Sequence, residues 1–213
     1  MSAAPTLGVY KLPTIDNEPM RNYEPNSKDR QELQKAVDEL LASKPFEIPV
    51  IIDGQEFRSG KLAKQVNPGD HARVVCYYHE ADERMVNTAI EGALKAKKQW
   101  MNMPWSERAA ISMKAADLIA HKYRYQLLAA TMVGQGKNVW QAEIDAGAEI
   151  CDFLRFGVKY VDDMYQIQPP RNSPGVWNRT EYRPLEGFVL AISPFNFTAI
   201  AGNLVMTPAM VGN

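Results

Sequence analysis

The clearest structural signal in this chain is the stretch Glu186-Gly-Phe-Val-Leu-Ala-Ile-Ser-Pro-Phe-Asn-Phe-Thr-Ala-Ile200. Residues 188–192 form an unbroken apolar run, as expected of a strand buried on both faces of a parallel sheet. Ser193-Pro194 ends this strand, because proline has no N–H to donate to a ladder. Thr198 can then cap a helix over the following residues. The stretch predicts a strand, a tight loop and a helix, and α/β proteins bind ligands where strands end in this way.

Asn196 is the one amide in this otherwise apolar loop. Its side chain offers two N–H donors that no change of pH removes. A fixed donor beside the end of a strand suits an oxyanion that develops during a reaction. Alternatively, the amide satisfies only the backbone of its own turn. The spacing alone leaves both interpretations open.

The loop also resembles a known motif. Residues 192–198, Ile-Ser-Pro-Phe-Asn-Phe-Thr, are similar to the Pro-(Trp/Phe)-Asn-Phe loop of the aldehyde dehydrogenase superfamily. The variant with Phe before Asn resembles the branch of that superfamily that acts on Δ1-pyrroline-5-carboxylate. Four other stretches agree with that branch: Leu185–Phe188, Asp16–Pro19, Thr131–Lys137 and Gln141–Asp145. The resemblance covers nearly the whole chain.

The resemblance implies an α/β fold, namely the N-terminal part of an aldehyde dehydrogenase. Helical segments and the first strands of a Rossmann-like parallel sheet are expected. Residues 1–26 would form an extended arm, and residues 27–165 and 185–213 part of the NAD-binding domain. Residues 166–184 would form a β-flap used for oligomerisation, because exposed strand edges invite pairing. The catalytic domain would be absent from this chain.

The resemblance also implies an activity. Members of this branch oxidise L-glutamate γ-semialdehyde to L-glutamate with NAD during proline breakdown, in eukaryotes in the mitochondrial matrix. Asn196 would be the catalytic oxyanion donor, and Glu149 and Phe197 would bind the substrate. The residues expected against the nicotinamide riboside are Ile192, Ser193, Pro194 and Phe195. The expected partners are a small-molecule aldehyde and either a second copy of the chain or the missing C-terminal portion.

A nucleophile is not evident in this sequence. Aldehyde dehydrogenases form a thiohemiacetal on a cysteine, and the matching position lies beyond Asn213. The two cysteines, Cys76 and Cys151, stand in an expected strand and an expected helix, where they resemble small core residues. We therefore expect this chain to supply part of an active site and to be inactive alone. The alternative is a truncated, non-catalytic relative that serves as a structural subunit.

Composition narrows the other possibilities. A formal net charge of -1 argues against a broad electrostatic grip on nucleic acid or an anionic membrane. No apolar run is long enough to cross a bilayer. Two distant cysteines suit a reducing compartment, and residues 1–7 lack the apolar core of a signal peptide. The three histidines match no metal-ligand spacing, so no metal site is expected.

Two further patterns allow a functional and a structural interpretation. Gly134-Gln-Gly-Lys137 resembles a phosphate loop, but Thr131 and Asn138 break the Walker pattern, so a helix end followed by a new helix is favoured. Glu143, Asp145 and Glu149 share a long helix, and such carboxylates usually form a solvated face. If Glu149 alone points inward, burial should raise its pKa. In that case Asp145→Asn should leave turnover intact.

Periodicity and turn residues predict the remaining elements. A hairpin is expected over 48–57 around Asp53-Gly54, and strands over 73–78 and 177–182. Helices are expected over 28–42, from Asp82, from Glu107, over 123–133 with Gly134 as its C-cap, over 139–164 and over 199–210.

Overall fold

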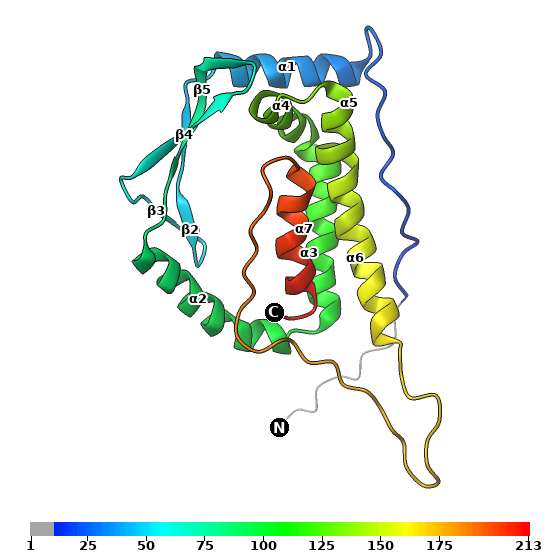
Figure 1. The fold of residues 1–213 in the computed structure, drawn as a ribbon. Coiled ribbons are helices and arrows are strands. Elements are labelled where there is room, and N and C mark those ends of the chain that lie inside the picture. Colours follow the sequence, from blue (N-terminus) through cyan, green and yellow to red (C-terminus); the bar gives the residue numbers. More distant parts are fainter. Residues whose placement is uncertain (1–10) are drawn as a thin grey trace, which may run out of the picture.

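The computed structural model describes residues 11–213, so the first ten residues of the expected arm lie outside it. Three helices stand side by side as a column: α3 (Trp105–Asp117), α6 (Ile150–Tyr165) and α7 (Thr198–Met210) (Figure 1). Helix α4 (Arg124–Gln135) lies at the top of this column (Figure 1). A short helix, α5 (Val139–Ala142), precedes α6. Helix α1 (Lys28–Ala42) crosses the top of the column, and α2 (Glu83–Asn102) runs beneath the strands at its side.

The strands form two small sheets. In the first, β5 (Asp70–His79) pairs in parallel with β1 (Phe46–Ile48) and antiparallel with β4 (Leu62–Asn67). In the second, β2 (Val50–Ile52) and β3 (Gln55–Phe57) make the expected hairpin. Asp53 and Gly54 turn it with φ angles of 51° and 73°, as a two-residue turn of this kind requires. The α/β class expected from the sequence is confirmed.

One cluster of buried residues forms where helices pack against each other through small side chains. Ala116 and Ala120 pack against Cys151, Leu154 and, from α7, Ala199. Alanines on facing helices allow the backbones to approach closely, so α7 lies directly against α3 and α6. This packing places the beginning of α7, and the loop before it, at one end of the column.

Most helices expected from the sequence are confirmed, with small shifts in their caps. Ser27 rather than Asn26 caps α1, through its hydroxyl and the backbone N–H of Arg30. Asp82 caps α2 as predicted. The C-cap of α4 is Gly136, with a φ of 67°, and not Gly134. Of these two glycines, Gly136 alone lies in the left-handed region that glycine adopts without strain.

The long helix expected over 139–164 contains a π-helical segment, Glu143–Glu149, between α5 and α6. A second π-helical segment, Leu118–Lys122, joins α3 to α4. Such segments add a residue to a turn and are often found at functional sites. The Glu143–Glu149 segment carries all three carboxylates singled out in the sequence.

The predicted strand over 188–192 is not formed. These residues are extended but exposed, and Ile192 retains 78% of its accessible surface. Lys97 of α2 ties the start of the segment by donating to the backbone oxygen of Gly187 (3.1 Å). Within residues 11–213 no strand pairs with it, because both sheets lie elsewhere (Figure 1). An apolar run becomes a strand only beside partners that satisfy its backbone groups.

The strand expected over 177–182 is also absent. Residues 166–184 instead form an exposed excursion that projects beyond the end of α6 (Figure 1). Gln168 bridges it, accepting from the N–H of Thr180 (2.8 Å) and donating to its carbonyl oxygen (3.4 Å). Trp177, which directly follows the turn at residues 173–176, is 91% exposed. Side-chain bonds replace the ladder that a flap of two paired strands would have.

Part of the arm is fixed to the helices by buried charges. Arg124 is fully buried and donates to Glu143 and to Glu18 of the arm (2.7 Å for Glu18). Glu18 also binds Arg155 (2.6 Å), and the Tyr23 hydroxyl donates to Glu143 (2.5 Å). Because buried charges are tolerated only when paired, this network fixes the extended arm against α4 and α6.

Candidate functional site

The candidate site is the loop that leads into α7. The expected cap of that helix is wrong, because Thr198 is the first helical residue and its side chain does not cap. The Asp145 carboxylate caps α7 instead. It accepts from the backbone N–H groups of Thr198 (2.9 Å) and Ala199 (2.8 Å). A carboxylate at this end satisfies unpaired N–H groups and complements the helix dipole.

Lys137 holds the same loop from the other side. Its Nζ donates to the backbone oxygen of Asn196 (2.6 Å) and to Asp145 Oδ2 (2.7 Å). It also lies 4.3 Å from the centre of the Phe197 ring. The Lys137 side chain is 15% exposed and that of Asp145 is 1% exposed. Hydrogen bonds between a partly desolvated ion pair and backbone groups are strong and directional.

The side chain of Asn196 is exposed and free. Throughout the described chain, no group forms a hydrogen bond with its amide, so it does not satisfy the turn as the alternative interpretation required. Its donors are available for a ligand, although nothing here encloses one.

The residues expected to meet the cofactor lie in the same exposed loop. Ile192, Ser193, Pro194 and Phe195 are all exposed, and Phe195 keeps 94% of its surface. Phe197 is held against Lys137. Exposed apolar side chains grouped in this way mark a surface that binds something else.

Glu149 is half-buried on the π-helical segment that carries Asp145. Burial raises its pKa, as expected, and the nearby Asp145 carboxylate raises it further, while Lys137 acts in the opposite direction. The Glu149 carboxylate has no hydrogen-bond partner within residues 11–213. A carboxyl with a raised pKa and free oxygens can hold or move a proton.

The solvated acidic face expected for Glu143 and Asp145 is wrong. Both carboxylates are buried. Glu143 pairs with Arg124, and Asp145 pairs with Lys137 and with the backbone N–H groups at the start of α7. The extra residue in the π-helical turn rotates side chains away from the positions that a 3.6-residue period assigns. The expectation that Asp145→Asn is harmless therefore no longer stands.

Lys137 and Asp145 are the residues that sequence reasoning missed at this site. Gly136 ends α4, and Asn138 begins α5 with a reciprocal capping box to Gln141, which confirms the rejection of a phosphate loop. Lys137, between these caps, is free to turn toward the loop. One feature of the sequence could have indicated this pair. Lys137 stands in a turn, eight residues before Asp145 on the next helix, so the two opposite charges could be expected to meet.

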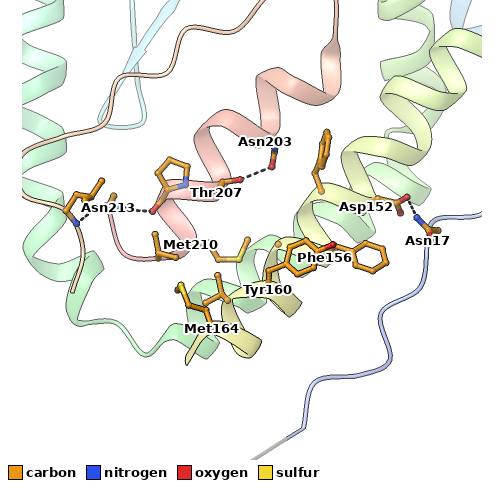
Figure 2. A pocket seen from close by; sticks show the side chains of 15 residues that line it. Asn17, Asp152, Phe156, Tyr160, Met164, Asn203, Thr207, Met210 and Asn213 are labelled. Carbon is orange, nitrogen blue, oxygen red and sulfur yellow. Dashed lines mark hydrogen bonds between the residues drawn. The ribbon is translucent and has the colours of Figure 1, made fainter. Parts of the chain in front are cut away.

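A cavity lies away from this loop (Figure 2). It has a volume of about 760 Å³ and lies between α6, the end of α7 and Asn17 of the arm. Its walls are mainly apolar, with Phe156, Tyr160 and Met210 prominent. The Asp152 carboxylate at its edge is engaged by Asn17 (2.6 Å). None of the site residues expected from the sequence lines it.

Both cysteines lie in the core, as expected of small apolar residues. Both are buried, and burial raises the pKa of each thiol, that of Cys151 to about 11. Of the histidines, His79 is buried, and its Nε2 lies 2.7 Å from Glu47 Oε1. Among residues 11–213, no group of three or more potential ligands could hold a metal ion. None of the helices described there is long and apolar enough to span a membrane.

Comparison with known proteins identifies the class to which this fold and loop belong. The aldehyde dehydrogenase family model matches residues 55–213. The chain belongs to that family.

Particular relatives share a narrower description. The chain is 59% identical over 211 residues to Delta-1-pyrroline-5-carboxylate dehydrogenase of Agaricus bisporus, covering 99% of this chain and 39% of the relative. It is 54% identical to the mitochondrial enzyme of that name from Emericella nidulans, covering 98% and 36%. The crystal structure of the Mycobacterium tuberculosis enzyme bound with NAD superposes with a TM-score of 0.93 at 42% identity, covering 97% and 38%. The chain spans less than two fifths of the length of each.

Proposed function

We propose that this chain is the N-terminal part of an NAD-dependent dehydrogenase that oxidises L-glutamate γ-semialdehyde to L-glutamate. The supporting observation is the loop before α7. Its Asn196 amide has no hydrogen-bond partner within residues 11–213, and its backbone is held by Lys137 and Asp145. The chain that carries it matches a pyrroline-5-carboxylate dehydrogenase over almost all its residues. A free, fixed amide donor is what an aldehyde oxygen requires as negative charge develops on it.

The residues of the loop and the nearby Glu149 then have distinct roles. Asn196 donates to the developing oxyanion, and Phe197 and Glu149 face the substrate. Burial raises the pKa of Glu149 and so favours its protonated form, which suits a carboxyl that exchanges a proton with the substrate. The nucleophilic thiolate is supplied by residues outside this chain.

The loop fits one part of a dinucleotide. Ile192, Pro194 and Phe195 present an exposed apolar surface against which a planar ring and ribose can pack, and Ser193 adds a hydroxyl. When bound, NAD supplies the hydride acceptor. No free basic group in the loop could hold its phosphates, since the nearby Lys137 is already engaged. Other parts of the enzyme would bind that half of the cofactor.

The remaining expectations are part of the same proposal. Residues 27–165 and 185–213 contribute to the NAD-binding domain, and the excursion over 166–184 is the oligomerisation flap. Exposure of Trp177 in this excursion supports a contact with a second copy of the enzyme. The names of the relatives from Emericella nidulans and Homo sapiens support a mitochondrial location, and the proposed place there is the matrix.

The test compares this chain with the complete enzyme, by which we mean a polypeptide of the relatives' length that contains residues 1–213. With glutamate γ-semialdehyde and NAD, the complete enzyme should form NADH, and the 213-residue chain alone should not. No semialdehyde-dependent NADH from the complete enzyme would refute the proposal. The alternative, a non-catalytic subunit, requires the source polypeptide to have an intact mass near 23.9 kDa.

A further inference from the structure

Three backbone groups around Phe197 are held by side chains from another part of the chain. The carbonyl oxygen of Asn196 accepts from Lys137, and the N–H groups of Thr198 and Ala199 donate to Asp145. These contacts flank Phe197 on both sides. The backbone on either side of this residue therefore cannot rotate without breaking a charge-assisted hydrogen bond.

The two side chains also act as one unit. Asp145 Oδ2 accepts from both Lys137 Nζ (2.7 Å) and the Thr198 N–H (2.9 Å), so the same oxygen joins the two halves of the clamp. The Phe197 ring, 4.3 Å from Lys137 Nζ, adds a cation–π contact. Loss of either charge would leave its partner poorly compensated, because both side chains are largely shielded from water.

The clamp determines where Asn196 points. The Asn196 side chain has no bond of its own to a neighbour in the described chain, so what the clamp holds is the backbone position and the direction in which this side chain leaves it. An oxyanion donor stabilises charge effectively only if it needs no rearrangement during the reaction. A misplacement of about 1 Å at such a site can reduce the rate about 10²-fold.

We propose that Lys137 and Asp145 are positioning residues, which clamp the backbone around Phe197 and thereby aim the Asn196 amide at the aldehyde oxygen. The inference rests on the proposed function for its catalytic consequence. Its structural part, the clamp itself, concerns only residues of this chain.

The catalytic part is tested by a double-mutant cycle in the complete enzyme. Lys137→Met should lower kcat by roughly 10–10², with little change in KM for NAD, and Lys137→Arg should restore part of the loss. In an Asn196→Ala background, Lys137→Met should change kcat by no more than about twofold, since the donor it aims is already gone. Asp145→Asn should behave like Lys137→Met.

The matched control is Lys159→Met, which removes an exposed pair with Asp163 on α6. It should leave kcat unchanged in both backgrounds. If Lys137→Met costs the same factor with and without Asn196, the two residues act independently and the positioning role is wrong. Unchanged kcat in Lys137→Met would overturn it equally.

The structural part is tested without turnover, by amide hydrogen exchange in the 213-residue chain. The N–H groups of Thr198 and Ala199 should be protected, and Asp145→Asn and Lys137→Met should each speed their exchange while amides in the middle of α6 stay unchanged. Unaltered exchange would refute the clamp whatever the enzyme's substrate. If the clamp is present but the complete enzyme does not oxidise the semialdehyde, the proposed function fails and the clamp stands.

Discussion

At the residue scale, buried charges in this chain organise irregular backbone. Asp145 and Lys137 fix the loop before α7, and Arg124 fixes the arm through Glu18. In both cases ionic side chains bind groups of the loop or the arm that no helix or sheet satisfies. Such groups must find partners when they are shielded from water, and a charged side chain provides a strong one.

The proposed role of Asn196 gives a direct prediction. In the complete enzyme, Asn196→Ala should lower kcat by roughly 10²–10³, the usual effect of losing one oxyanion donor. KM for NAD should change little, because the substitution leaves the apolar wall of the loop intact. Steady-state kinetics with varied NAD separates the two constants. Turnover near that of the wild type would show that the amide has no part in the reaction.

The pair of arginines around Glu18 predicts a pH dependence of stability. Burial alone would raise the pKa of this carboxyl, but hydrogen bonds from Arg155 and Arg124 outweigh it and hold the pKa below its ordinary value. The ionised form is thus favoured by folding. Its contribution is present above the unfolded pKa of about 4.3 and is lost as pH falls through the lower folded pKa.

Urea unfolding of the 213-residue chain at several pH values checks this expectation. Glu18→Gln should lower the free energy of unfolding at pH 7 by about 1–3 kcal/mol, since it leaves buried donors poorly paired. The difference between wild type and variant should shrink on acidification below about pH 4. A difference that stays constant down to pH 2 would mean that Glu18 is not held ionised by its partners.

At the element scale, the π-helical segment Glu143–Glu149 connects the arm, α4 and α7. Glu143 faces Arg124 on α4, and two residues later Asp145 faces the start of α7. The Gly147 backbone lies close to the Glu143 carboxylate, because a Cβ added at Gly147 would stand 2.7 Å from Glu143 Oε2. Glu143 cannot yield easily, because Arg124, Tyr23 and the Arg21 N–H all bind it.

A matched pair of glycine substitutions tests this packing. Gly147→Ala should destabilise the chain by about 1–3 kcal/mol through overpacking. Gly134→Ala, inside α4 with no atom within 4 Å of the new Cβ, should stabilise it by about 0.4–1 kcal/mol. Chemical unfolding of both variants measures the two effects. Equal effects would mean that helix propensity alone, and not the crowding at Glu143, sets the response.

At the scale of the whole molecule, the apolar run 188–192 lacks the strand pairing that its composition predicts. It is extended and exposed, and both sheets lie elsewhere (Figure 1). Its composition still suits a buried strand. Because an apolar strand sequence is unfavourable in an exposed position, we expect a partner outside the described residues to cover this segment and to pair with its backbone.

Amide hydrogen exchange can show whether this segment gains a strand partner in the complete enzyme. In the 213-residue chain, residues 188–196 should exchange almost as fast as an unfolded peptide, while the middle of α6 is protected. In the complete enzyme, residues 188–192 should become protected, because a neighbouring strand would then accept their N–H groups. Protection in the short chain, or its absence in the complete enzyme, would contradict this expectation.

The sequence by itself determined the helices, the Asp53-Gly54 hairpin, the family and the loop that carries Asn196. Each rests on a local signal: a period, a turn residue, a cap or a short motif. Only the tertiary structure decided that Asp145 caps α7, that Lys137 holds the loop, and that residues 188–192 remain unpaired. Those outcomes depend on partners 53 or more residues away for Asp145 and Lys137, and on neighbouring strands for 188–192. Local propensity carries no information about such partners, because a buried charge or a strand is stabilised only by the groups that surround it in space.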